Sequence, residues 1–406
     1  MFSFKSKLHT ELIYCIENKL YAKYRVIIKC KKLQEGIEDK LSKYKNAVIH
    51  NSNKTLGIIG CTVTPSILER ICEYPEVSFI CLDDPCFLCA TKSYTGSGIK
   101  NANRLRLSSK HDLCGRGISI GLIDTGIFPH NDLSNPNKIT LFLDLINNYK
   151  YPYDDNGHGT FMAGVICGNG KASKGTYEGI AKGGSLCSVK AFNGNGRGFS
   201  SDILFAIEYL INESSENNIR ILCLPFEILT HNSFILSLFS NILDKALEKD
   251  LIPIVPSGSN IGEGSIMGIS LLKNCITVSG LDTSKGGYKE YTFSSYGPSN
   301  TKEQKPTISA GCNNICSLNT LSSFIPERNG SRLYPPHLED SYKTLSGTSI
   351  ACAYASGVFS LILEKKPSLK FKDLLSLSSM GCKDLGLSKN IQGYGVLDLN
   401  SILDNL

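Results

Sequence analysis

Three short segments of the chain each centre on a side chain that could take part in acyl transfer. Asp124 ends an apolar run, His158 stands between two glycines, and Ser349 follows Gly347-Thr348. A serine hydroxyl is a weak nucleophile unless a base lies within hydrogen-bond reach, and the base needs a partner that fixes its tautomer. Histidine suits the base because its pKa is ordinarily about 6.5. We therefore expect Ser349 to be the nucleophile, His158 the base and Asp124 its partner.

These three residues are far apart along the chain, so only a tertiary fold can bring them together. Near-continuous apolar runs predict buried strands of a parallel sheet, and longer periodic segments between them predict helices. Strands that alternate with helices indicate a doubly wound, mostly parallel α/β sheet, which binds ligands at the carboxyl ends of its strands. Asp124 lies at one such end. The expected strands are 118–123, 186–191, 219–224, 252–255 and 275–278, and the expected helices are 158–167, 201–211, 235–248 and 349–364.

The first part of the chain predicts a separate small domain. Residues 24–30, 47–50, 56–63 and 77–81 are typical of strands, while 33–44 and 65–72 are typical of helices. The order β-α-β-β-α-β predicts a ferredoxin-like α+β sandwich. Turn-forming residues in 85–115 predict a linker. We therefore divide the chain into an N-terminal domain at 1–90, a linker and leading segment at 91–115, and the large domain at 116–406.

Composition excludes several classes of function. The chain has 406 residues and a formal net charge of +6, and no basic run is interleaved with aromatic residues, which argues against a nucleic-acid partner. No apolar run approaches the roughly 20 residues needed to span a membrane, and the first residues lack the layout of a secretory signal. Most of the 16 cysteines stand singly in apolar segments, which predicts reduced thiols and a cytoplasmic location. Cys86-x-x-Cys89 lacks a matching second pair, so zinc is not expected.

The motifs around Asp124, His158 and Ser349, in this order, resemble the subtilisin-like serine peptidases (subtilases, peptidase family S8). Further similarity lies in Gly179-Ile180-Ala181, in residues 293–298 and in residues 393–398. The resemblance implies a serine endopeptidase that acts on protein or peptide substrates. It also implies that the N-terminal domain is an inhibitory prodomain, removed from the zymogen by autoprocessing, at a bond between Asp84 and Gly98. The many Lys, Asn, Ile and Ser residues would fit a low-GC bacterium, and with it a spore-associated role.

The resemblance also implies an oxyanion hole and a substrate pocket. In Ser259-Asn260-Ile261-Gly262, Asn260 matches the residue that stabilises the oxyanion. The segments that match the family's substrate-binding strands contain Leu224, Pro225 and Phe226, and Ser257, Gly258 and Ser259. Phe226 stands where the family usually has glycine, and Ser259 replaces another glycine. We interpret both departures as narrowing the pocket, which would favour a small residue before the scissile bond.

Two further expectations concern residues outside the triad. Asp155, close to His158, is interpreted as a solvated loop charge or a local helper. Asp132 resembles a calcium ligand of some family members, but Gly168-Asn169-Gly170-Lys171 matches the rest of that loop poorly, so we expect no cofactor, with calcium as the one candidate. The alternative to a peptidase is a catalytically quiet subtilase that binds another protein, motivated by the altered segment at 224–226. A small-molecule sensor is supported only by fold analogy.

Overall fold

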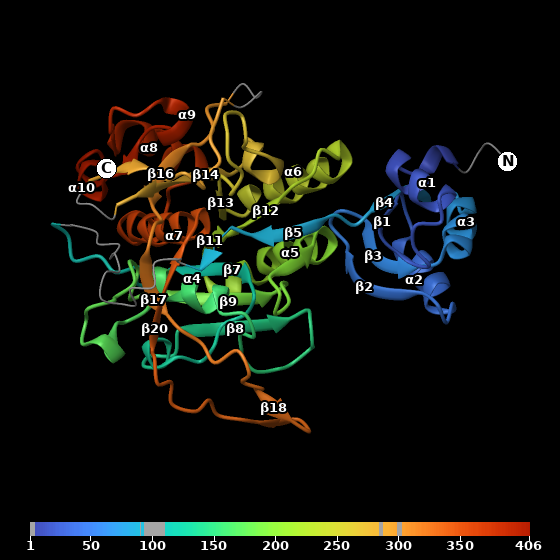
Figure 1. Cartoon of the computed structure of the whole chain (residues 1–406), viewed down its shortest axis with the longest axis horizontal. Helices are drawn as coiled ribbons and strands as arrows, with labels where there is room; N and C mark the ends of the chain where they lie inside the picture. The colour runs from blue at the N-terminus through green and yellow to red at the C-terminus, as the bar shows by residue number, and fades with distance from the viewer. Residues whose placement is uncertain (1–4, 90, 93–109, 284–286, 299–302) are drawn as a thin grey trace.

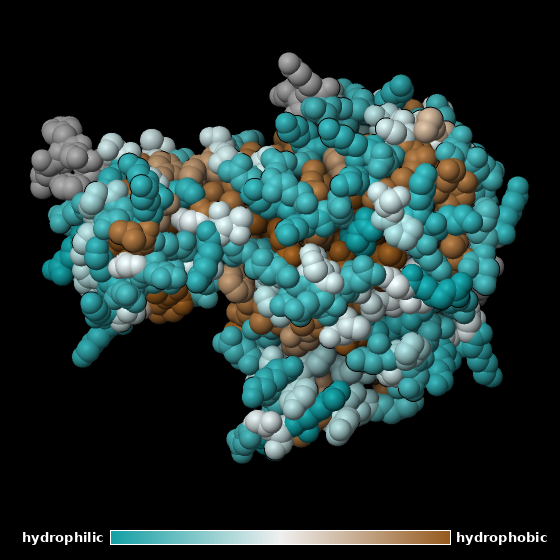
Figure 2. Space-filling view, turned by 180° about the vertical axis from the view of Figure 1, so that it is seen from behind, coloured by the Kyte–Doolittle hydropathy of each residue, from teal (hydrophilic) through white to brown (hydrophobic). Residues whose placement is uncertain are grey.

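The computed structural model describes residues 5–89, 91–92, 110–283, 287–298 and 303–406. Figure 1 shows a small N-terminal domain beside a large α/β domain, with strand β5 (Pro85–Leu88) extending from the first into the second. Hydrophilic side chains cover most of the face in Figure 2, and apolar ones show in separate patches. None of the described helices combines the length and apolar character that crossing a bilayer requires.

The N-terminal domain has the predicted order of elements. Its four strands form an antiparallel sheet in the order β2-β3-β1-β4, as in a ferredoxin-like sandwich. Pro65 at the first helical position after Thr64 begins α3 where the sequence predicts it. An additional helix, α1 (Thr10–Glu17), precedes β1. The elements are β1 (Tyr24–Cys30), α2 (Gln34–Ser42), β2 (Val48–Asn53), β3 (Ile58–Val63), α3 (Pro65–Glu73) and β4 (Val77–Leu82).

The large domain is built on a mostly parallel sheet, as predicted. Its strands lie in the order β21-β22-β16-β14-β13-β11-β7-β9-β8, and β15 (Lys289–Glu290) pairs with β14 at the side. All neighbours along this order are parallel except β21 and β22. The strands are β7 (Ser119–Asp124), β8 (Ile139–Asp144), β9 (Ser185–Lys190), β11 (Ile219–Cys223), β13 (Ile252–Pro256), β14 (Ile276–Asp282), β16 (Ile308–Gly311), β21 (Cys382–Lys383) and β22 (Val396–Leu397).

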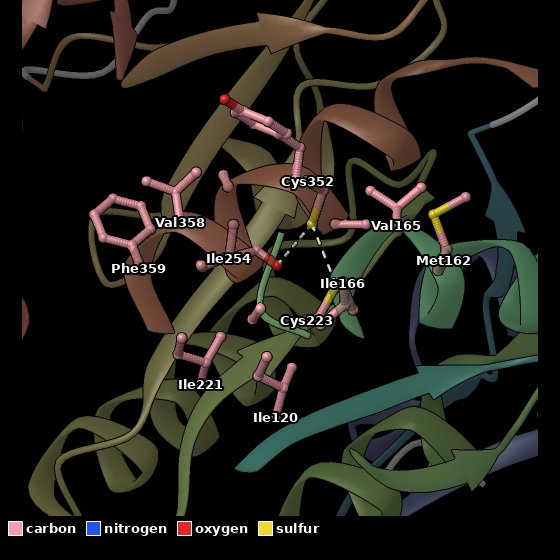
Figure 3. Packing of buried hydrophobic residues seen from close by; sticks show 14 of the residues in the cluster. Ile120, Met162, Val165, Ile166, Ile221, Cys223, Ile254, Cys352, Val358 and Phe359 are labelled. Atoms are coloured by element: carbon pink, nitrogen blue, oxygen red, sulfur yellow. Dashed lines mark hydrogen bonds between the residues drawn. The ribbon is translucent and has the colours of Figure 1, made fainter. Parts of the chain in front are cut away.

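Helices cover both faces of this sheet. α4 (His158–Cys167) and α7 (Thr348–Lys365) pack on one face, and α5 (Ser200–Asn217) and α6 (Ser233–Glu248) on the other. Small residues let α7 run through the core, where Cys352 faces Cys223 with the sulfur atoms 3.9 Å apart (Figure 3). All 16 cysteines are free thiols.

The order of the strands explains how the segments that carry Asp124, His158 and Ser349 come together at the carboxyl end of β7. After β7 the chain crosses to β8 and β9 on one side, and later reaches β11 on the other, so the carboxyl end of β7 is a switch point of the topology. Asp124 is the last residue of β7, while His158 begins α4 and Ser349 lies in the first turn of α7.

The prediction of a linker at 85–115 is wrong for the part that the structure describes before residue 93. β5 lies between β10 (Arg197–Phe199) and β12 (Phe226–Ile228), antiparallel to both. The backbone of β6 (Thr91–Lys92) pairs with β20 (Tyr342–Ser346), which also pairs with β17 (Ile315–Leu318). The sequence misled because Pro and Gly frequency reports turn propensity, whereas these strands form by pairing with distant segments. Residues 93–109 of the predicted linker lie outside the described residues.

Candidate active site

Asp124 and His158 form a buried hydrogen-bonded pair. Both carboxylate oxygens of Asp124 lie 2.8 Å from Nδ1 of His158. The other ring nitrogen, Nε2, is buried and has no partner among the described residues. Because Nδ1 is held by the carboxylate, Nε2 is the nitrogen left to exchange a proton.

Local backbone contacts fix this pair. The hydroxyl of Thr125 accepts the N–H of Gly159 at 2.9 Å, which ties the end of β7 to the start of α4. A Cβ at Gly159 would lie 2.1 Å from the carbonyl oxygen of Gly126, so only glycine allows this approach. The carboxylate of Asp154 accepts N–H groups of Gly157 and Thr160 at 2.7 and 2.9 Å, and so caps the helix that carries His158.

Ser349 is buried in the first turn of α7, which packs beside α4. Its hydroxyl donates to the carbonyl of Pro225 at 2.7 Å. No hydrogen bond joins Ser349 to His158 among the described residues, so the structure brings together the first pair of the predicted triad and leaves the hydroxyl turned toward Pro225.

The chain itself crosses the site at Cys89. The N–H of Cys89 donates to Oγ of Ser349 at 3.1 Å, and the N–H of Ser349 donates to the carbonyl of Cys89 at 3.3 Å. Before Cys89, β5 pairs with β10 and β12, with Leu88 opposite Phe226. After it, the backbone of β6 pairs with β20, the strand that leads to Ser349. Residues 85–89 therefore approach the serine as a strand-paired peptide, and the backbone of 91–92 pairs with the large domain on its other side.

The predicted oxyanion residue makes a different contact. Nδ2 of Asn260 donates to Oε2 of Glu227 at 3.3 Å and makes no described hydrogen bond to the Cys89 carbonyl. Ser259 also binds this carboxylate, through its N–H at 3.1 Å and through its hydroxyl. In this arrangement the N–H of Ser349 is the described donor to the Cys89 carbonyl. The Asn260 amide binds Glu227 because a carboxylate is a strong hydrogen-bond acceptor.

The residues predicted to bind substrate divide into two groups. Pro225 and Gly258 lie at the site: the Gly258 carbonyl accepts the hydroxyl of Thr348 at 3.0 Å. Ser259 faces Glu227, as described above. The interpretation that Phe226 narrows the pocket is wrong, because its side chain is fully buried and its ring centroid lies 5.3 Å from that of Phe192 in the core. Leu224 and Ser257 are likewise buried, Leu224 in the apolar core and Ser257 against the hydroxyl of Ser294.

Asp155 fits the second of its two interpretations, a local helper, and its side chain stays 29% exposed. Its carboxylate lies 2.6 Å from Nζ of Lys190, a lysine that is completely buried. The same ammonium donates to the carbonyl of Thr125 at 2.7 Å and to that of Phe192 at 3.0 Å. Asp155 thus neutralises the buried lysine that holds the residue after Asp124.

Asp132, the residue that resembles a calcium ligand, is held by hydrogen bonds within the chain. Its carboxylate accepts the hydroxyl of Tyr342 at 2.5 Å and the N–H of Ala172 at 2.7 Å. No cluster of three or more His, Cys, Asp or Glu side chains suited to a metal occurs in the described part of the chain.

The N-terminal domain contacts the large domain through polar groups around the start of α5. Nδ2 of Asn51 donates to Asp202 at 2.6 Å. The carboxylate of Glu208 accepts the N–H of Thr55 at 2.6 Å and that of Lys54 at 3.2 Å. These contacts hold the domain beside the strand that enters the site.

Glu227 and Cys89 lie at the site although the sequence predicted no role there for either; Cys89 was considered, in Cys86-x-x-Cys89, only as a zinc ligand. Glu227 follows Phe226, which the sequence marked as unusual, so the neighbouring acid was a signal available in the same segment. Cys89 offered no local signal, because its position depends on the pairing of β5 with distant strands.

Comparisons with known proteins agree with this geometry. The model of the family described as "Subtilase family" matches residues 115–395. "Serine protease AprX" of Bacillus subtilis (strain 168) is 29% identical over 88% of this chain and 81% of its own length. "Minor extracellular protease Epr" of the same organism is 26% identical over 92% of the chain, which spans about half (53%) of Epr. Fervidolysin of Fervidobacterium pennivorans has the same fold, with a TM-score of 0.70 at 16% identity, over 95% of this chain and 61% of its own.

Proposed function

The chain belongs to the subtilase family of serine peptidases, and from that membership and the site geometry we propose that it is a serine endopeptidase made as a zymogen, which cleaves itself between Cys89 and Ala90. The observation that carries the proposal is the contact between Cys89 and Ser349. The Cys89 carbonyl accepts the Ser349 N–H at 3.3 Å, while the strands on both sides of it pair with the large domain. This contact supports the proposal because it keeps the Cys89 carbonyl beside the nucleophilic serine.

The proposed reaction follows from the groups at the site. The hydroxyl of Ser349 turns from Pro225 to His158, gives its proton to Nε2, and attacks the Cys89 carbonyl carbon. Asp124 stabilises the imidazolium that forms. The N–H of Ser349 donates to the developing oxyanion, and the amide of Asn260 becomes a second donor once it leaves Glu227.

The second half of the reaction uses the same groups. His158 returns the proton to the amine of residue 90 as the peptide bond breaks, which leaves an acyl-enzyme at Cys89. Water then attacks the ester with His158 as base, and the products are a new carboxylate at Cys89 and a new amine at residue 90. Every proton transfer in this scheme is assigned to a side chain of the chain, so we propose that catalysis requires no cofactor.

We further propose that the N-terminal domain is an inhibitor in cis. β5 occupies the space between β10 and β12 that an incoming substrate strand would need, by the same edge pairing that many proteins use to bind peptides. After cleavage, the contacts of Asn51 with Asp202 and of Thr55 with Glu208 remain in place. Protein or peptide substrates would enter only when this domain leaves.

The mass of the purified chain tests the proposal. The unaltered chain should separate into two fragments with the boundary after Cys89, and Ser349→Ala should stay intact. If both chains are folded and both stay intact, the alternative of a catalytically quiet subtilase that binds another protein replaces the proposal. Because all 16 cysteines are free, we propose that the protein works in a reducing compartment, and the preparation should keep a reductant.

A further inference from the structure

Glu227 is a buried carboxylate at the substrate cleft with no basic partner. It is 6% exposed, and none of the ion pairs formed by the described residues includes it. It lies on β12, where its backbone pairs with Phe87 of the crossing strand. Its oxygen atoms instead accept the N–H and hydroxyl of Ser259 and the amide of Asn260. A charged group is buried at such cost only where several donors stabilise it.

The side chain that faces Glu227 is that of Cys89, the residue before the proposed cleavage point. The thiol is 1% exposed, and Cys89 lies two residues after Phe87, the residue paired with Glu227, so the Cys89 and Glu227 side chains lie on the same face of the strand pair. Burial, followed by the charge of Glu227, raises the pKa of this thiol, so it stays protonated and can donate a hydrogen bond.

The carboxylate also limits the depth of the pocket. A Cβ built on Gly258, on the opposite wall, would lie 2.8 Å from Oε2 of Glu227 and 2.9 Å from Oγ of Ser295. Glu227 therefore spans the space between β12 and the segment at 257–260. A side chain longer than cysteine would have to displace the carboxylate and break its hydrogen bonds to Ser259 and Asn260, which leaves a buried charge without donors.

We propose that Glu227 determines specificity: its carboxylate closes the pocket under the residue that precedes the scissile bond, and selects a small side chain that donates a hydrogen bond, cysteine or serine. This inference rests on the proposed function and names its substrate class. Large apolar residues are excluded by size, and alanine is disfavoured because it leaves the carboxylate facing the pocket without the donor that cysteine or serine supplies.

Self-cleavage of the full chain tests this directly, with the rate followed by intact mass. Cys89→Ser should be cleaved within about threefold of the unaltered chain, Cys89→Ala about tenfold more slowly, and Cys89→Phe at least about a hundredfold more slowly. Glu227→Gly should accelerate the Cys89→Phe chain by at least about tenfold and slow the cysteine chain. Glu227→Gln, which keeps the volume, should still exclude phenylalanine. Glu290→Gly, an exposed glutamate far along the sequence on β15, is the matched control and should leave every ratio unchanged.

A second readout does not need cleavage. In a Ser349→Ala background, amide hydrogen exchange at residues 86–89 reports whether β5 is seated in the cleft. Cys89→Phe should raise exchange there at least about tenfold, and Glu227→Gly should reverse most of that rise.

The two readouts separate the possible failures. If the unaltered chain is never cleaved, the proposed function fails, and the exchange measurement still decides whether Glu227 limits the pocket. If the unaltered chain is cleaved and Cys89→Phe is cleaved within threefold of it, or if Glu227→Gly leaves the ratio of phenylalanine to cysteine unchanged, the assignment of Glu227 is overturned.

Discussion

The carboxylate of Asp83 accepts two hydrogen bonds from Ser201, one from the backbone N–H at 2.9 Å and one from the hydroxyl at 2.7 Å. Asp83 follows the last strand of the N-terminal domain, and Ser201 lies in the first turn of α5 in the large domain. A residue of one domain thus caps a helix of the other. Arg25 binds Asp83 at 2.8 Å and Asp202 at 2.7 Å, so the joint is a buried network of two carboxylates and one guanidinium.

Removing the cap should loosen the joint between the domains. Asp83→Ala removes the cap of α5 and one of the two carboxylates that bind Arg25 at the interface, and we expect a loss of about 2–4 kcal/mol. The measurement is chemical unfolding in a Ser349→Ala background, together with the rate of limited proteolysis within 85–92. Glu35→Gln removes an exposed ion pair with Lys54 and should change neither. Equal effects of the two substitutions would contradict this account of the joint.

Lowering the pH should increase the contribution of Asp202 to the free energy of unfolding. Burial raises the pKa of this carboxyl to about 6, against the opposing effect of Arg25. A raised pKa in the folded chain means that its stabilising contribution is complete below the ordinary value of 3.8 and is lost as the pH rises through about 6. Between about pH 4.5 and about pH 7.5, the free energy of unfolding relative to Asp202→Asn should fall by about 2 kcal/mol. Urea unfolding across this range measures it, and a constant difference would refute the prediction.

Asp124→Asn should slow self-cleavage without unfolding the chain, because Asp124 orients His158 and does not itself attack the peptide bond. The amide keeps the size of the side chain, but presenting its N–H to Nδ1 of His158 places the imidazole proton on Nε2, which then cannot act as a base. We expect self-cleavage to slow by a factor on the order of 10⁴, with the melting temperature nearly unchanged. Ser349→Ala provides the baseline. Rates within tenfold of the unaltered chain would show that Asp124 does not orient His158.

Lys190→Met should destabilise the loop after β7. The buried ammonium is replaced by a side chain that cannot donate to Thr125 or Phe192 and that leaves Asp155 without its cation, so we expect a loss of about 3 kcal/mol. Self-cleavage should also slow, because Thr125 adjoins Asp124. Adding Asp155→Asn should restore part of the stability. A double variant less stable than Lys190→Met would contradict the prediction that the loss of stability comes from leaving the Asp155 carboxylate without its cation.

The sequence predicted β7 and α4 well because the residues that determine each element lie within that element. The apolar run that ends at Asp124 and the small residues from His158 to Cys167 define β7 and α4 almost to the residue. The role expected of Phe226 failed for a different reason. Alternation along an edge strand fixes which side chains face the core, and β12 forms only because β5 pairs with it. No local pattern gives that register, so the sequence could not tell that Glu227, rather than Phe226, faces the cleft.

The same limit applies to Asn260. Its place in the chain was predicted from the motif, but its hydrogen-bond partner depends on a carboxylate from another strand. Charge interactions between distant segments are decided by packing, and a side-chain amide takes whichever acceptor the fold places nearest. Asn260 therefore illustrates that a motif predicts the position of a functional group better than it predicts its conformation.

A close approach at Gly60 gives a test of how the N-terminal domain docks on α5. Gly60 lies on β3 opposite Ile27, and a Cβ there would lie 2.4 Å from Oγ and 2.6 Å from Cβ of Ser201 across the domain joint. Gly60→Ala should therefore prevent close docking of the N-terminal domain on α5 while leaving the antiparallel sheet intact, since alanine is tolerated in a strand. Limited proteolysis within 85–92 should accelerate at least about tenfold in the Ser349→Ala background.

A compensating substitution separates steric exclusion from general instability. Ser201→Gly removes the two nearest atoms that the new methyl group would meet and leaves Oδ1 of Asn51 at 2.9 Å, so the double variant should regain part of the protection that Gly60→Ala loses, although the hydrogen bond from the Ser201 hydroxyl to Asp83 is gone. Gly36→Ala is the matched control, because a Cβ at Gly36 meets nothing within 4 Å, and alanine in a helix is more stable than glycine by about 1 kcal/mol. Protection that falls equally in Gly36→Ala and Gly60→Ala would place the effect inside the N-terminal domain, and failure of Ser201→Gly to rescue would show that the contact at Ser201 does not limit docking.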